Sequence, residues 1–419
     1  MAKPQSPLTF RDYRLYWIAR FSAVLAQVGM VVVIGWQVYD IARTDYGMDP
    51  KAAAFQLGLI GIAQFLPLLL LMPVAGWMAD RYDRRIVSAA AISLDLFNAL
   101  ALGWMTAHNT LTLPALFTVA ALHGTVRAFN GPSLSSIAPN LVPAASLPQA
   151  IAMSSIAWQT GGILGPALGG FAYAAHPALP YWIASALLAI TALSIISIKP
   201  FARISIKGGS HPLRQMIDGL SYVRRNRFLL GAITLDLFAV LLAGATALLP
   251  VYARDILKVG PEGLGWLRGA PALGATMMAL WFSVRPLSSN VGVKMLGAVI
   301  AFGVATIVFG YSRNIWLSLG MLVILGGADM LSVYVRSSLT QLYTPDEMRG
   351  RVNAVSQLAI SGSNELGEAQ SGLAAALIGP VGAVVAGGAG AIAVTLIWAY
   401  IFPELRRAKT FDPPKETLT

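Results

Sequence analysis

Residues 76–85 read Gly-Trp-Met-Ala-Asp-Arg-Tyr-Asp-Arg-Arg and stand between two long apolar runs. So many charges in one short stretch are costly inside a bilayer, whereas each flanking run is long enough to cross one. The stretch therefore predicts a tight basic loop that joins two membrane helices. In one interpretation Arg81, Arg84 and Arg85 only anchor the loop at the cytoplasmic surface. In the other, Asp80 also caps the positive N-terminal end of a neighbouring helix.

The composition of the whole chain agrees with a membrane protein. Of its 419 residues, 56% are hydrophobic and only 12% are charged, and the mean hydropathy is +0.65. The net charge of +11 does not indicate nucleic-acid binding, because the basic residues cluster in short segments between apolar runs. The chain has no cysteine and four scattered histidines, so we expect neither a disulfide nor a metal site. The first apolar run is too long for a cleavable signal and is expected to remain as a span.

Spans of about 20 apolar residues predict an all-α integral membrane protein with twelve transmembrane helices. The expected domains are an N-terminal six-helix bundle (1–198), a cytoplasmic linker (199–227) and a C-terminal six-helix bundle with a short cytoplasmic tail (228–419). Within the linker, 212–223 is expected to form an amphipathic surface helix. The predicted spans are 13–39, 55–78, 86–107, 111–137, 150–174, 180–198, 228–253, 264–284, 293–311, 315–339, 352–377 and 381–402.

Basic residues also predict the orientation of the chain. They are frequent near both termini, in the linker and in the loop at 76–85, which the twelve spans place on one side of the membrane. The other side holds only five, namely Arg43, Lys51, Arg254, Lys258 and Arg313. The positive-inside rule then puts both termini and the linker in the cytoplasm.

A weak internal repeat supports two related halves. Gly124 and Gly326 are separated by 202 residues, as are Pro143 and Pro345. The offset also aligns the fourth predicted span with the tenth. We interpret the repeat as a duplication, although chance matches in a chain rich in Ala and Gly are the alternative.

Two motifs in the first half resemble a known family. The order Gly76-x-x-x-Asp80-Arg81-x-x-Arg84-Arg85 is similar to the loop that transporters of the major facilitator superfamily (MFS) carry between their second and third helices, where it acts as a latch. The predicted fifth helix contains a second pattern, similar to the motif of antiporter-type exporters in that superfamily. This resemblance implies two pseudo-symmetric six-helix bundles around a central cavity, the MFS fold. The glycines and proline of the second pattern are Gly161, Gly165, Pro166, Gly169 and Gly170.

Residues in the second half narrow the resemblance. Residues 235–238, 248–257, 344–352 and 363–368, with 10–17 before the first span, resemble the enterobactin-exporter-like branch of drug:proton antiporters. The resemblance implies a siderophore or drug exporter of the bacterial inner membrane. One departure is that no Asp-Arg-x-x-Arg-Arg loop follows the eighth span, so the latch of the second half is expected to be weaker or absent.

Charged residues inside the predicted spans are the best functional clues. Each costs about 2.5 to 3.5 kcal/mol at the bilayer centre, so it should face the bundle interior, be paired, or titrate. Glu365 and Glu368 are three residues apart on one helix face, where repulsion favours binding of a proton by one of them. Asp329 and Asp236 are further candidates for proton coupling. The alternative is structural, with each acid paired to an arginine, for example Asp329 with Arg336 or Arg127.

Other polar and aromatic residues are candidates for the walls of the cavity. Arg20 and Gln27 are expected to face it, and His123 is read as either a packing group or a proton relay. Aromatic residues beside few charges suit a partly apolar organic compound. The complete set of cavity candidates is Arg20, Gln27, Arg127, Phe129, Phe238 and Arg336.

The sequence therefore predicts a proton-coupled secondary exporter of small, partly apolar organic compounds that works by alternating access. A dedicated siderophore exporter, a lipid flippase and an importer are the alternatives. An enzyme or receptor is disfavoured, because the chain has no Cys, few His and no soluble domain to build a nucleophile, metal or ligand site. ATP-driven transport by this chain alone is disfavoured, because no P-loop pattern is present. We expect no cofactor besides the proton gradient, and partners limited to the substrate, protons and the lipid bilayer. The chain is expected to function as a monomer.

Overall fold

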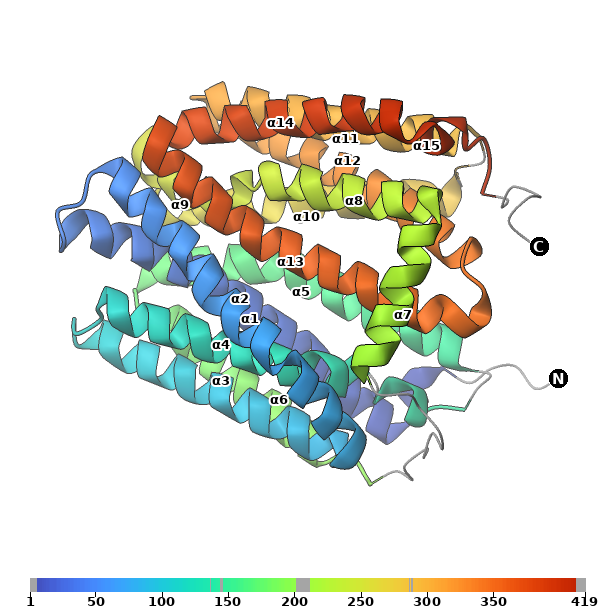
Figure 1. The fold of residues 1–419 in the computed structure, drawn as a ribbon. Coiled ribbons are helices and arrows are strands. Elements are labelled where there is room, and N and C mark those ends of the chain that lie inside the picture. Colours follow the sequence, from blue (N-terminus) through green and yellow to red (C-terminus); the bar gives the residue numbers. More distant parts are fainter. Residues whose placement is uncertain are drawn as a thin grey trace. The chain divides into compact units, whose positions relative to one another are not determined.

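The computed structural model of the chain describes residues 6–135, 137–143, 146–200, 212–285, 287 and 289–411, and within these ranges it contains helices and no strand. The first six long helices are α1 (Arg11–Thr44), α2 (Pro50–Arg81), α3 (Arg84–Ala107), α4 (Leu113–Ser135), α5 (Leu147–Ala175) and α6 (Leu179–Ile196) (Figure 1). After the linker helix α7 (Pro212–Arg225), the seventh span comprises α8 (Arg227–Leu242), η4 (Ala245–Leu248), α9 (Leu249–Val251) and the π-helical η5 (Tyr252–Ile256). The last five are α10 (Gly260–Val284), α11 (Val291–Tyr311), α12 (Ile315–Leu342), α13 (Asp346–Ile378) and α14 (Pro380–Ile401). Short helices are η1 (Pro7–Thr9), η2 (Ala138–Asn140) and α15 (Pro403–Arg407).

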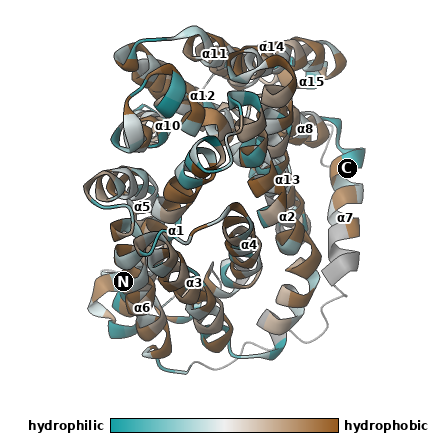
Figure 2. Ribbon diagram, turned by 90° about the vertical axis from the view of Figure 1, so that its left-hand side faces the viewer, coloured by the Kyte–Doolittle hydropathy of each residue, from teal (hydrophilic) through white to brown (hydrophobic). Residues whose placement is uncertain are grey.

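The described part of the chain thus contains the twelve spans expected from the sequence. Eight of them are long and apolar enough to cross a membrane by composition alone. The other four, α4, α5, α10 and α13, carry more glycine or charge, such as Arg127 in α4 and Glu365 in α13. Apolar residues run along the helices, and hydrophilic residues gather at loops and helix ends (Figure 2).

The helices fall into two units by their contacts. Unit 1 comprises Met1–Gly47, Ile62–Gly209 and Val259–Gly269, and unit 2 comprises Met48–Gly61, Ser210–Lys258 and Ala270–Thr419. The first turns of α2 therefore belong to unit 2, and the first turns of α10 belong to unit 1. The expected domain boundaries at 198 and 228 remain a prediction.

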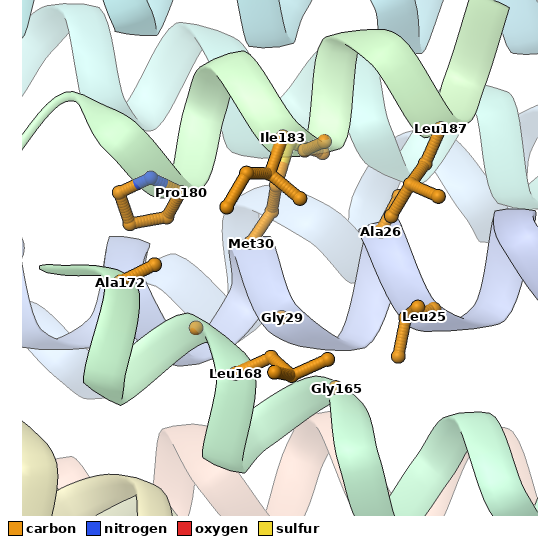
Figure 3. Close-up of a pocket in the computed structure, with 12 residues that line it drawn as sticks. Leu25, Ala26, Gly29, Met30, Gly165, Leu168, Ala172, Pro180, Ile183 and Leu187 are labelled. Atoms are coloured by element: carbon orange, nitrogen blue, oxygen red, sulfur yellow. The ribbon is translucent and has the colours of Figure 1, made fainter.

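Glycines on α5 bring it close to α1 in unit 1. A Cβ atom at Gly165 would lie 3.1 Å from the carbonyl oxygen of Leu25, and one at Gly169 would lie 2.8 Å from that of Gly29. At Gly161, a Cβ would lie 2.8 Å from a methyl group of Val24. Small residues at this spacing let two helix backbones approach each other. Where α6 joins the pair, the three helices line an apolar pocket that includes Leu168 and Ile183 (Figure 3).

The other face of the glycine motif contacts α10 within unit 1. A Cβ at Gly170 would lie 2.6 Å from the carbonyl oxygen of Pro261, and one at Gly265 would lie 3.0 Å from that of Pro166. The motif therefore packs α5 between α1 and the first turns of α10.

In unit 2, α13 packs against α7, α8 and α14, and α11 packs against α12 and α14. Buried residues such as Leu229, Leu235, Val335 and Leu339 form the core. The linker helix α7 is amphipathic, as expected. Its Tyr222 hydroxyl donates to the carbonyl oxygen of Tyr343 at 3.2 Å, whereas Ile217 and Leu220 are exposed.

Candidate functional site

Unit 2 contains a cavity of about 320 Å³ that two acidic side chains line. Asp329 comes from α12 and Glu368 from α13, with Asn364 one turn before Glu368. The rest of the wall is mostly apolar and includes Phe302 of α11. The lining is completed by Val240, Ala243, Gly244, Ala245, Thr246, Pro271, Ala272, Ala275, Leu325 and Gly326.

A break in the seventh span forms one wall of this cavity. α8 ends at Leu242, and the chain resumes as the 3-10 helix η4 at Ala245. The break lies against α13, because a Cβ at Gly244 would be 2.6 Å from the carbonyl oxygen of Gly367. Non-helical backbone at membrane depth is tolerated where it is buried in protein or lines a cavity, and transporters use such breaks at binding sites. The broken segment and Asn364 were not predicted, although Gly244 inside an apolar run is a signal that could have found the break.

Asp329 differs from the other acids of the site in having no partner. Among the residues that the structure describes, none forms a hydrogen bond or ion pair with its carboxylate. Its side chain is half-buried at the cavity wall. An ionised carboxylate there is costly unless a proton or a cationic group compensates it.

Asp236 of α8 lies beside Asp329 but is neutralised. The two aspartates line one small neighbouring cavity together with Ser332. Arg336 of α12 forms an ion pair with Asp236, and both side chains are buried. The sequence suggested Asp329 as a partner for Arg336, because they share a helix face. The arginine pairs instead with the acid on the adjacent helix.

Glu365 and Glu368 lie on one face of α13, and Gly61 of α2 packs against this face. A Cβ at Gly61 would lie 3.0 Å from the Glu365 carbonyl oxygen and 3.1 Å from Cβ of Glu368. Glu365 is buried, whereas Glu368 is half-buried and reaches the cavity. Of the two glutamates, Glu368 is thus the one positioned to meet a substrate or a proton from the cavity.

The aromatic and basic cavity candidates lie elsewhere. Phe238 packs on Trp398 of α14 with ring centroids 5.3 Å apart and does not line the cavity of unit 2. In unit 1, the Arg20 guanidinium lies 5.6 Å from the centre of the Trp158 ring, and Phe129 packs on Leu68, Ala75 and Ala128.

The two remaining candidates also lie in unit 1. Nε2 of Gln27 on α1 donates a hydrogen bond to the Asp95 carboxylate. Arg127 is half-buried on α4.

The basic loop at 76–85 is held by Asp83. This residue caps α3 by accepting a hydrogen bond from the backbone N–H of Arg85 at 3.0 Å. The Arg85 side chain binds the same carboxylate, with Nη2 at 2.6 Å from Oδ2, and also donates to the carbonyl oxygen of Ile198 after α6. Helix capping by a loop acid was expected of Asp80, whose side chain lies outside the described residues; Asp83 was not singled out.

Two other residues of the loop are placed by their contacts. The Arg81 guanidinium lies 5.3 Å from the centre of the Trp77 ring. Open space surrounds the Cα of Gly76 on the side where a Cβ would stand.

Comparison with known proteins identifies the family. The enterobactin exporters EntS of Shigella boydii serotype 18 and of Escherichia coli O139:H28 are each 25% identical over 412 residues, covering 98% of this chain and 96% of the exporter. Among solved structures, a POT family transporter in complex with 5-aminolevulinic acid superposes with a TM-score of 0.71 at 13% identity, covering 94% of this chain and 97% of that one. A bacterial homologue of the human lysosomal transporter Spinster, inward-facing and unoccupied, gives 0.70 at 15% identity, covering 95% and 97%.

These likenesses establish the fold. It is the twelve-helix transporter fold of two six-helix bundles that the sequence predicted. The transmembrane secretion effector family matches residues 2–414 of the 419. The chain therefore is a transporter and not an enzyme, and it belongs to the transmembrane secretion effector family of the major facilitator superfamily.

Proposed function

We propose that this protein exports small, partly apolar organic compounds across the bacterial inner membrane by proton-coupled alternating access. Both termini face the cytoplasm, a single chain suffices, and the proton gradient is the only energy source. The proposal rests on the family membership, on the exporters that match over nearly the whole chain, and on one feature of unit 2.

That feature is the Asp329 carboxylate, which faces a cavity and has no described partner. In contrast, Asp236 beside it is already neutralised by Arg336. Because an isolated charge costs about 2.5 to 3.5 kcal/mol at the bilayer centre, Asp329 gains most from binding a proton or a cationic substrate. Proton and substrate then compete for one carboxylate, which is what an antiporter requires. Glu368 across the cavity is the second acceptor, and Glu365 and Asp236 contribute to the charge of the site.

The cavity also supports the substrate class. Its volume of about 320 Å³ lies at the lower end of the range for small-molecule sites. Its wall combines apolar side chains with a few polar groups, namely Asn364, Thr246 and the two acids. Such a wall suits an organic compound with one polar or cationic group better than a sugar or an inorganic ion.

The alternative within transport is a dedicated siderophore exporter. The matching relatives are named enterobactin exporters, which favours this candidate. A lipid flippase and an importer remain as outcomes of the transport assay.

The two sequence motifs have proposed roles in the transport cycle. The loop with Gly76, Asp80, Arg81, Arg84 and Arg85 acts as a latch at the cytoplasmic side. The motif with Gly161, Gly165, Pro166, Gly169 and Gly170 lets α5 slide on α1, since the glycines leave a smooth contact face.

The test is transport into inverted membrane vesicles that contain the protein. A pH gradient is imposed, and a panel of dyes, drugs and catecholate siderophores is offered as substrates. We expect gradient-dependent movement of several unrelated compounds. Movement of a siderophore alone would favour the dedicated exporter. Movement of lipid only, or in the importing direction only, would overturn the proposal.

The role of Asp329 is tested with Asp329→Asn, which should reduce gradient-driven transport at least tenfold and, because the substrate binds the same carboxylate, should also weaken substrate exchange without a gradient. The matched control is Asp45→Asn, because Asp45 is an exposed acid after α1. Full gradient-driven transport by Asp329→Asn would remove this residue from the mechanism.

A further inference from the structure

Unit 1 encloses a second acid, Asp95 of α3, which is 0% exposed. Nδ1 of His123 on α4 lies 2.9 Å from one of its carboxylate oxygens and 3.1 Å from the other. Nε2 of Gln27 on α1 donates to the second oxygen at 2.7 Å. Three helices thus bring polar side chains to one buried carboxylate. We call these residues, with Asn98 of α3, the Asp95 cluster.

Asn98 gives the cluster an unused acceptor. Its Nδ2 lies 3.5 Å from the Asp95 carboxylate, and the residue is 1% exposed. Among the described residues, none donates a hydrogen bond to its Oδ1. Turning the amide over would set two acceptor oxygens against each other, so the orientation with Nδ2 toward Asp95 is the consistent one. Buried acceptors normally have donors, so the cluster has spare capacity to accept one.

The charge of the pair changes when it binds one proton. With Asp95 ionised and His123 neutral, the net charge is −1. One added proton brings it to zero, either as an imidazolium beside a carboxylate or as an imidazole beside a carboxylic acid. Groups this close bind the proton as a unit. Histidine is also the side chain whose proton exchange falls at physiological pH.

The surrounding helices carry few other charges. Arg127 lies one turn after His123 on α4, and Arg20 lies two turns before Gln27 on α1. Arg84 and Arg85 stand at the start of α3, about three turns from Asp95. α6, which packs on both α1 and α3, contains no charged residue. The hydrogen bond from Gln27 is a described contact that stabilises the state of charge −1.

We propose that Asp95 and His123 form a proton-binding site in unit 1, which takes up and releases one proton in each transport cycle. This inference rests on the proposed proton-coupled export and adds a site in the opposite unit to the cavity acids. Protonation of the site should weaken the contact between α1 and α3. The reason is that a neutral Asp95 carboxyl group accepts the hydrogen bond of Gln27 less strongly than a carboxylate does.

Proton binding is tested first by NMR of protein labelled at the histidine imidazole nitrogens, in lipid nanodiscs. The chain has only four histidines, so single His→Gln variants assign the signals. Proton binding at the site predicts that the His123 signals change with pH. Asp95→Asn should lower the midpoint by at least one pH unit, a tenfold loss of proton affinity. The exposed His108 should not move.

Gln27→Leu is the second variant, and it keeps both members of the pair. It removes one donor to the carboxylate, so the midpoint for His123 should rise. A His123 signal that does not change with pH, or that has the same midpoint in wild type and both variants, would overturn the site.

Coupling is tested separately with His123→Gln in the vesicle assay above. Gradient-driven transport should fall at least tenfold, while exchange without a gradient continues; His108→Gln is the matched control. Wild-type transport by His123→Gln would overturn the coupling role. If His123 titrates as expected but wild-type transport ignores the gradient, proton-coupled export fails and the binding site stands.

Discussion

The two units hold a buried acid in different ways. Asp95 in unit 1 is completely enclosed and receives polar contacts from Gln27, His123 and Asn98. Asp329 in unit 2 stands at the wall of a cavity, where no described residue binds its carboxylate. For both acids, ionisation in a largely apolar interior costs free energy. In unit 1, the polar side chains of the Asp95 cluster offset this cost. In unit 2, no described side chain offsets it, so a bound proton or cationic substrate would have to do so.

The difference separates stability from function. Removing the charge of Asp95 discards contacts that the fold already makes, so part of the effect should appear in folding. Removing the charge of Asp329 discards no contact, so the effect should appear only in transport. Substitutions at these two acids, and at a third acid whose partner is a full charge, test this contrast.

Arg336→Met should have the largest effect. It leaves Asp236 buried without its ion-pair partner, which typically costs about 3 to 5 kcal/mol. Thermal unfolding of the purified protein in detergent measures this loss. The double variant with Asp236→Leu should recover most of it. If the double variant were as unstable as the single one, lost packing and not the stranded charge would be the cause.

Asp95→Asn should destabilise the protein by about 1 to 3 kcal/mol, because hydrogen bonds to a buried charge are lost and a donor group is turned toward other donors. The same unfolding assay measures it. An unchanged unfolding temperature would mean that the Asp95 cluster contributes nothing to stability. The proposed contrast between Asp95 and Asp329 would then be wrong.

Asp329→Asn should change stability by no more than about 0.5 kcal/mol, since it breaks no described contact. Measured alongside Asp95→Asn, it provides the other half of the comparison. A loss as large as that of Asp95→Asn would show that Asp329 has a structural partner and would remove its distinction from the other acids.

Gly61→Ala should have the smallest effect on transport. The new methyl group would meet Glu365 and Glu368 at 3.0 to 3.1 Å, so α13 must shift by a few tenths of an ångström. Transport should fall a few-fold, while unfolding changes by less than about 1 kcal/mol. Gly320→Ala is the control, because it adds a methyl group in open space on α12. Equal transport by both variants would show that the packing of Gly61 on α13 does not affect the function of the site.

The spans were predictable from the sequence because burial in lipid requires long apolar runs. The third span was expected at 86–107 and is observed at Arg84–Ala107, and the ninth was expected at 293–311 and is observed at Val291–Tyr311. The eleventh begins earlier than expected, at Asp346, because its polar first turns carry no apolar signal. The break after Leu242 was not predictable from hydropathy, since a contact with Gly367 more than 100 residues away accompanies it.

The acids that line the cavities could be singled out from the sequence, but their pairings could not. Four acids were singled out because charge is rare inside spans, and the structure gathers three of them, Asp236, Asp329 and Glu368, around neighbouring cavities. Helix periodicity relates residues on one helix only. It therefore suggested Asp329 for Arg336, whereas the partner is on α8, and it could not pair His123 with Asp95 on α3.

α13 has a mechanical consequence that follows from its length. Its 33 residues make a rod of about 50 Å. Near one end, Gly219 of α7 packs on the Arg351 backbone, and near the other, Gly58 of α2 packs on Gly372. Measured from Glu365, these contacts lie about 21 Å and about 10 Å away along the axis. The two contacts therefore lie at unequal distances from Glu365. A tilt of α13 by about 5° about Glu365 would move the residues at the α7 contact by about 2 Å and those at the α2 contact by about 1 Å.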